Sequence, residues 1–149
     1  MRSLLKPEPL AEIKSRLDTL SESDRAIWGK MNPAQMLHHC QKTFEVPLGN
    51  SDLKRPNFIM RMLFKNFKKS LYDGKPWKKN LPTARQLRVS SEKNFSEEKD
   101  RLLQLMEEFH GKGYEHDWPE HPAFGNFTAE QWGQMQYKHL DHHLSQFGV

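Results

Sequence analysis

The chain contains one cysteine, Cys40, among 149 residues, and it lacks any long apolar run. A single cysteine excludes a disulfide within the chain. No stretch has the length of a membrane span, and the first residues, MRSLLKPEPL, lack the apolar core of a signal peptide. We therefore expect a cytoplasmic protein with no membrane span, and the absence of disulfides adds weak support.

Apolar residues are also scarce, since they make up 36% of the chain and the mean hydropathy is -0.89. Those present include four Trp and nine Phe, which bury a large area per residue. The apolar residues recur at helical spacing, and this argues against disorder. The length suits one hydrophobic core, so we expect residues 1–149 to form a single domain.

Acidic residues are nearly missing from one part of the chain. Residues 54–79, called the basic segment below, hold nine Lys or Arg and one Asp. Their net charge is +8, which leaves −4 for the rest of a chain whose total is +4. Such a segment can bind nucleic acid or an anionic surface. No nucleic-acid-binding motif accompanies it, so we favour a solvated helix face and do not expect nucleic acid as a partner.

No convincing strand pattern or internal repeat is present, and helical periodicity predicts an all-α chain. The first main helix is expected from Pro9 to about Leu20. The second begins at Pro33, which Asn32 can cap, and ends before Pro47. The other two main helices are expected over residues 91–110 and from Thr128 to about residue 147, where Thr128 and Gln131 form a capping box.

An additional helix is expected from Pro56 to about Leu71, inserted among the four main helices. It is basic and amphipathic, and it can also be interpreted as a membrane-surface helix. Its apolar residues are Phe58, Ile59, Met62, Leu63 and Phe67. A loop is expected between this helix and residue 85.

Two histidines four residues apart, in KHLDHHLSQF, lie on one side of the last helix. At about 100° per residue, His139 and His143 both project to the same edge of the apolar stripe centred on Leu140. His142 projects about 200° from Leu140, onto the outer face. Gln136 and Gln146 share the polar column of the two selected histidines.

A third histidine lies far upstream, in NPAQMLHHC. His39 lies at the edge of the apolar stripe of the second helix, whereas His38 points away from it. Facing helices of a bundle can bring His39 to His139 and His143. Three neutral imidazoles around a divalent ion leave coordination positions open for chemistry. The sequence therefore predicts a three-histidine metal site, with no HExxH motif to supply a general base.

Each of these residues also has a simpler interpretation. A histidine pair four apart is more often a surface feature, and only the agreement of the two helices favours a ligand set. Gln136 and Gln146 can orient the ligands or pack at the edge of the core. His121 can approach the metal or, as we favour, hold a loop by hydrogen bonds. Cys40 is interpreted as a buried structural thiol, and packing is favoured for Trp118, Phe124 and Trp132.

The motif NPAQMLHHC, followed a hundred residues later by HxxHHxxQ, resembles the DinB-like superfamily of metal-dependent helical bundles. The stretch HPAFGNFTAEQWGQMQYKHLDHHLSQFGV is similar to an uncharacterised, domain-of-unknown-function branch of it. The resemblance implies a four-helix bundle, here with an additional inserted helix. It also implies metal ligands from the second and last main helices, which fall on His39, His139 and His143.

Characterised members of that superfamily include thiol-S-transferases, which use a low-molecular-weight thiol, and a hydrolase-like group. The resemblance therefore implies a divalent ion, for which imidazole ligands suit Zn, Ni or Fe. Such an ion can lower the pKa of bound water to about 7 for hydrolysis, or bind a thiol. The alternatives are a metal-binding or scaffold protein without turnover and a binder of anionic surfaces through the basic segment. We also expect a homodimer, because bundles of this type often pair.

Overall fold

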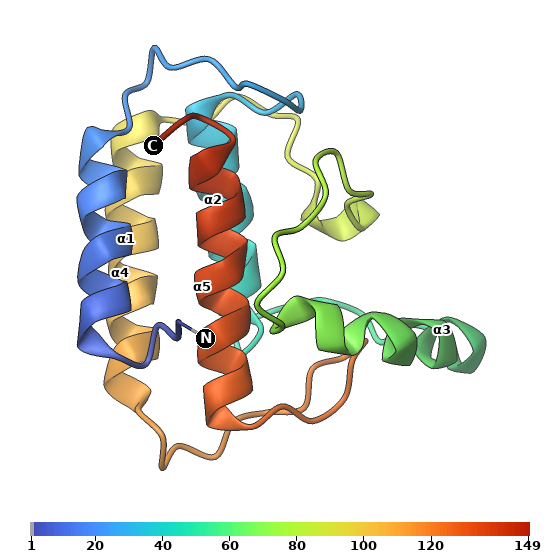
Figure 1. Ribbon diagram of the computed structural model, residues 1–149. Helices are drawn as coiled ribbons and strands as arrows, with labels where there is room; N and C mark the ends of the chain where they lie inside the picture. Colours follow the sequence, from blue (N-terminus) through green and yellow to red (C-terminus); the bar gives the residue numbers. More distant parts are fainter. Residues whose placement is uncertain (1) are drawn as a thin grey trace.

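The computed structural model describes residues 2–149, which form five α-helices and no strand (Figure 1). Short 3-10 turns follow α3 and precede α4. The elements are α1 (Pro7–Thr19), α2 (Pro33–Glu45), α3 (Phe58–Lys68), η1 (Lys69–Leu71), η2 (Arg85–Leu87), α4 (Phe95–Lys112) and α5 (Ala129–Ser145). For the described residues, the prediction of an all-helical chain is confirmed. Among them, no helix has both the length and the apolarity to cross a membrane.

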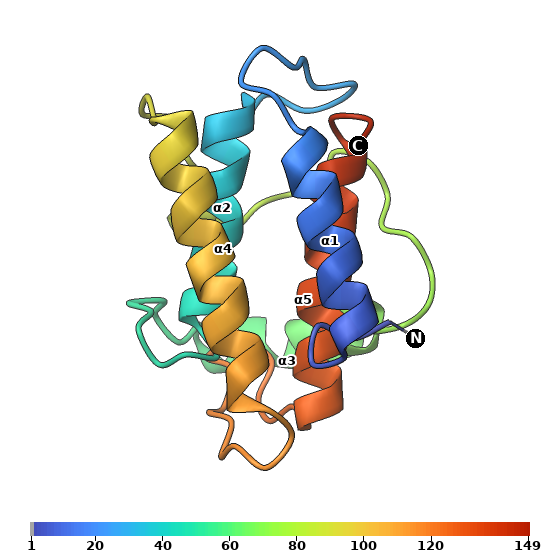
Figure 2. The ribbon, with the colours of Figure 1, turned by 90° about the vertical axis from the view of Figure 1, so that its left-hand side faces the viewer.

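Four of the helices lie side by side with similar axes (Figures 1 and 2). Helix α2 contacts α4 and α5, and α1 contacts the same two helices. Their inward faces form one apolar cluster, in which the fully buried side chains include Ile13, Leu17, Met36, Leu37, Phe44, Leu102, Leu105, Phe109, Leu140 and Leu144. The helical periodicity of the sequence correctly placed these residues in the core.

Side-chain caps fix where the two histidine-bearing helices begin. Asn32 accepts a hydrogen bond from the Gln35 backbone N–H, and the Gln35 side chain accepts one from the Asn32 N–H. Thr128 and Gln131 form the same reciprocal pair at the start of α5. Each pair satisfies two backbone groups that the first turn leaves without a partner. The predicted cap and capping box are confirmed.

Three predicted helix starts were wrong by a few residues. Helix α3 (Phe58–Lys68) begins at Phe58 instead of Pro56, because the Asn57 side chain accepts from the Met60 N–H. Helix α1 begins at Pro7 instead of Pro9, because a proline in the first turn loses no helical hydrogen bond. Helix α4 begins at Phe95 instead of Ser91, because the Asn94 side chain accepts from the Glu97 N–H and ends the preceding loop.

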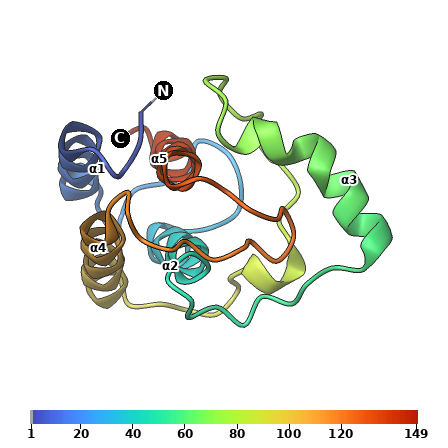
Figure 3. The same cartoon turned by 90° about the horizontal axis from the view of Figure 1, so that it is seen from below.

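Helix α3 lies apart from the other four helices, as Figure 3 shows from below. The Asn57 side chain caps it, and η1 continues it to Leu71, close to the predicted end. None of its residues is buried. Residues 72–94 then run from η1 back towards α2 and α4, and this segment lies beside the predicted site.

Candidate metal centre

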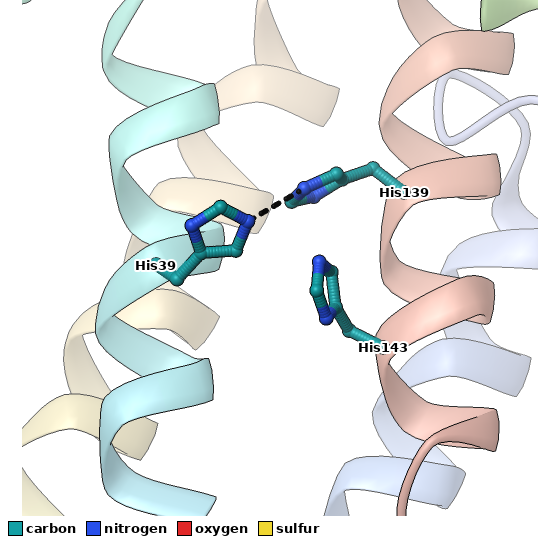
Figure 4. A group of neighbouring side chains, drawn as sticks. All are labelled: His39, His139 and His143. Atoms are coloured by element: carbon teal, nitrogen blue, oxygen red, sulfur yellow. Dashed lines mark hydrogen bonds between the residues drawn. The ribbon is translucent and has the colours of Figure 1, made fainter. Parts of the chain in front are cut away.

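The structure brings His39, His139 and His143 together between α2 and α5 (Figure 4). One ring nitrogen from each histidine lies within 4.8 Å of the others. The ring of His143 is 4.7 Å from that of His39 and 4.6 Å from that of His139, measured between centroids. His39 and His139 are buried and His143 is half-buried. The predicted convergence of three histidines from two helices is therefore found.

The spacing of these nitrogens fits a shared ion. The Nε2 atoms of His39 and His139 are 3.1 Å apart. Two imidazole nitrogens on one Zn²⁺, each at about 2.0–2.1 Å with a tetrahedral angle between them, lie about 3.3–3.4 Å apart. The observed separation is within a few tenths of an ångström of that value. The separation of this pair therefore fits two nitrogens bound to one ion, and the third histidine lies within 4.8 Å of both.

Hydrogen bonds behind the rings fix which nitrogen of two histidines carries the proton. Nδ1 of His39 lies 2.8 Å from the carbonyl oxygen of Leu87, which can only accept. Nδ1 of His143 lies 3.1 Å from Oε1 of Gln146, and the Gln146 amide donates to the Trp28 carbonyl. Both Nδ1 atoms therefore donate, and both Nε2 atoms are unprotonated. The 3.1 Å contact drawn in Figure 4 is then a hydrogen bond that Nε2 of His139 donates to Nε2 of His39.

Gln136 links α5 to α2 beside the third histidine. Its Nε2 donates to the Thr43 carbonyl at 2.8 Å, and its Oε1 lies 3.2 Å from the Thr43 hydroxyl. That hydroxyl is 3.4 Å from Nδ1 of His139. Gln136 is fully buried, so these bonds also satisfy an amide that would otherwise be costly to bury. Gln136 therefore reaches His139 through the Thr43 hydroxyl, whereas Gln146 contacts His143 directly.

Burial keeps all three imidazoles uncharged near neutral pH. Loss of solvation lowers the pKa of His39, and it lowers the pKa of His139 further. The pKa of His143 falls to about 3, mainly through burial and then through the nearby His39. A neutral imidazole is the form that binds metal, so none of the three rings has to lose a positive charge before an ion can bind.

The two histidines that the helix projection rejected lie outside this cluster. Nδ1 of His38 is 3.0 Å from the Glu98 carboxylate of α4. The ring of His142 packs between Trp28 and Trp77, at 5.9 and 5.6 Å between centroids. His142 is only partly exposed, which differs from the predicted outer face, because Trp77 and residues 26–31 cover that side of α5.

His121 is placed in the loop before α5. Its Nδ1 accepts hydrogen bonds from the backbone N–H groups of Ala123 and Phe124, at 3.0 and 3.3 Å. Its ring packs against Phe124 and Trp132, and burial, followed by the charge of Lys68, lowers its pKa to about 4. These bonds hold the loop, which is the structural alternative that the sequence favoured.

The remaining candidate residues pack in the interior. Cys40 is fully buried with its Sγ towards Met36, and burial raises the pKa of its thiol. Trp132 is also fully buried, and the ring of Trp118 packs on Phe109. The interpretation of Cys40 as a structural thiol therefore agrees with its surroundings.

Several residues around the centre were not predicted from the sequence. The Leu87 carbonyl is a backbone acceptor, which any residue supplies, so no residue type identifies it. Trp77 lies in an irregular segment, yet its ring is 5.9 Å from that of His139. Gly29 approaches the Gln146 amide so closely that a Cβ atom would overlap it. Gly29 also has a positive φ angle, which glycine adopts readily. The glycine itself is the one signal of this close approach that the sequence offers.

A family model described as "Protein of unknown function (DUF1569)" matches residues 2–148. The match covers all five helices and the three clustered histidines. No curated protein and no solved structure matches the chain. A function therefore has to be argued from the geometry of the centre.

Proposed function

This chain belongs to the DUF1569 family, and we propose that it is a DinB-like metal-binding protein in which His39, His139 and His143 hold one divalent ion. The observation that carries the proposal is the convergence of three imidazole nitrogens within 4.8 Å. Supporting it, the hydrogen bonds of His39 and His143 leave Nε2 free for a ligand bond. Metal-binding histidines almost always donate their other ring N–H to such an acceptor.

The arrangement of helices supports the DinB-like assignment. We interpret α1, α2, α4 and α5 as a four-helix bundle of a single domain and α3 as its inserted helix. The histidines lie on the second and the last helix of that set, as the resemblance implies. Ligands built from facing helices are characteristic of metal sites in bundles.

The donor set is three neutral imidazoles, which suit Zn, Ni or Fe. An ion with three protein ligands keeps open positions, so it supplies Lewis-acid chemistry and lowers the pKa of a water or thiol that binds there. The chain's own residues orient the ligands through the Leu87 carbonyl and the Gln146 amide. The ring of Trp77 packs beside that of His139, at 5.9 Å between centroids, and covers one side of it.

Two reactions follow from the resemblance, thiol-S-transfer with a low-molecular-weight thiol and hydrolysis. The alternative is a non-catalytic metal-binding or scaffold role. Thiols paired with electrophiles, and simple esters and amides, should be screened with metal-loaded and chelated protein. Turnover that chelation abolishes supports the catalytic role.

The metal proposal is tested with full-length protein purified without a histidine tag. Elemental analysis is expected to find about one divalent ion per chain after titration at neutral pH. X-ray absorption at the metal edge should then show three imidazole nitrogens in the coordination shell. Failure of Zn²⁺, Ni²⁺ and Fe²⁺ alike to bind at neutral pH would contradict the proposal.

Gln146 offers a test of ligand orientation. Gln146→Ala removes the acceptor for Nδ1 of His143, so metal affinity is expected to fall by about 10–100-fold while the stoichiometry stays unchanged. Gln41→Ala is the matched control, because Gln41 is similarly buried but bonds to Glu98 of α4. Competition titration with a chromophoric chelator measures both. Equal losses in the two variants would mean that Gln146 acts only through packing.

A further inference from the structure

Helix α3 carries an apolar face that no part of the described chain covers. Five of its side chains are each at least half exposed, namely Phe58, Ile59, Met62, Leu63 and Phe67. Among the helical elements, α3 contacts only η1, which continues it (Figure 3). A cluster of large apolar side chains on one exposed helix marks an interaction surface.

The helix attaches to the protein by its less apolar side. Lys68 donates to the carbonyl of Asn126, and Arg61 pairs with Glu120 at 3.5 Å. The ring of Phe64 packs 5.5 Å from that of Phe124, between centroids. At about 100° per residue these three side chains fall on one side of the helix, and Ile59 and Leu63 fall on the other. The amphipathic pattern is therefore inverted relative to the four packed helices, whose apolar faces point inward.

Positive charge borders the exposed face. Lys65 and Lys69 project beside Phe58 and Met62, and both lysines are exposed. The whole basic segment has a net charge of +8. Its one acidic residue, Asp73, is already paired with Lys138. Arg55 and Arg61 are paired with Glu120, so the exposed charges of the segment that border the apolar face are those of Lys65 and Lys69.

The positive charge beside the apolar face of α3 favours some binding partners over others. In a symmetric pair of chains joined through α3, the exposed Lys65 and Lys69 of both copies would lie near one another, which is unfavourable. An anionic bilayer complements the same charge and accepts the apolar side chains. We propose that α3 docks this protein on the surface of an anionic phospholipid bilayer. The docking is independent of the metal centre.

The mode of docking follows from the geometry of the helix. An interfacial helix lies in the plane of the membrane with its apolar face about 5–10 Å into the boundary between headgroups and acyl chains. Ile59, Met62 and Leu63 enter that layer, while Lys65 and Lys69 extend their ammonium groups to the phosphates. With 11 residues, α3 offers a small area, so apolar insertion and charge are both needed. Binding is therefore reversible and weakens as salt screens the phosphates.

Vesicle flotation with the full-length protein tests this proposal. We expect binding to vesicles of phosphatidylcholine mixed with phosphatidylglycerol, and little binding to pure phosphatidylcholine. The double variant I59S/L63S removes the centre of the apolar face, and K65Q/K69Q removes the flanking charge. Each is expected to weaken binding by about tenfold or more. All four positions are exposed, so folding is preserved, which thermal unfolding and metal content confirm.

Matched controls lie elsewhere on the surface. Ile27 is 65% exposed and outside α3, so I27S should bind as the wild type does. K30Q/K112Q removes two exposed lysines away from the basic segment and should also bind normally. Wild-type protein that fails to bind anionic vesicles would overturn the proposal. So would self-association or DNA binding that depends on α3 in the absence of vesicle binding, because the face would then join two copies or contact nucleic acid.

Discussion

Replacing His139 with alanine is expected to weaken metal binding by about a hundredfold or more, since losing a residue that merely orients a ligand already costs 10–100-fold. His139 is buried, and its ring lies at one corner of the triangle that the three histidine rings form. Its Nε2 is 3.1 Å from that of His39, and its ring is 4.6 Å from that of His143. In this variant only His39 of α2 and His143 of α5 remain as ligands, and the nitrogen of His139 is missing.

The matched control for His139→Ala is His142→Ala. His142 is the same residue type on the same helix, and it lies outside the cluster of ligating nitrogens. Isothermal titration with Zn²⁺ or Ni²⁺ measures the metal affinity of both variants. Thermal unfolding of the chelated proteins checks that both variants are folded without metal. A full complement of metal in His139→Ala, at wild-type affinity, would count decisively against the three-histidine site.

Acidification of the metal-free protein is expected to destabilise the fold over the range from about pH 6.5 to about pH 3, the folded-state pKa of His143. Burial lowers the pKa of His39, His139 and His143 in the folded state, that of His143 to about 3. In the unfolded chain the same groups take up protons near pH 6.5. The unfolded state therefore binds more protons in this window, and the free energy of unfolding decreases as the pH falls.

The size of this effect follows from proton linkage. Each such histidine lowers the free energy of unfolding by up to about 1.4 kcal/mol per pH unit, until the pH reaches its folded-state pKa. Urea unfolding in the presence of a chelator, repeated across the pH range, measures the slope. His143→Gln should reduce the slope by up to about 1.4 kcal/mol per pH unit. An unchanged slope in this variant would show that His143 is not held neutral by the fold.

The sequence predicts the packed helices and the histidine cluster for the same reason. A helix repeats its side-chain directions, so spacing alone selects the inward face of α2 and α5, and with it His39, His139 and His143. The start of α5 is also encoded locally, because Thr128 and Gln131 satisfy each other's backbone groups. Such features require no knowledge of the rest of the fold.

Other features depend on neighbours that a single helix does not reveal. His142 faces outward from α5 considered alone, but Trp28 and Trp77 reach it from segments without periodicity. In α3 the periodicity identifies the apolar face correctly and still gives no sign that this face points to solvent. The acceptor behind His39 is a main-chain carbonyl, which has no signature among the residue types.

The separation of 100 positions between His39 and His139 affects when an ion can be acquired. A chain emerging from the ribosome exposes His39 long before α5 has been synthesised, so the complete ligand set exists only after the last helix packs against α2. An ion bound there would then tie two distant parts of the polypeptide into one closed loop, and opening either part would require its release. Loading with metal would thus report that α5 has been synthesised and has packed against α2.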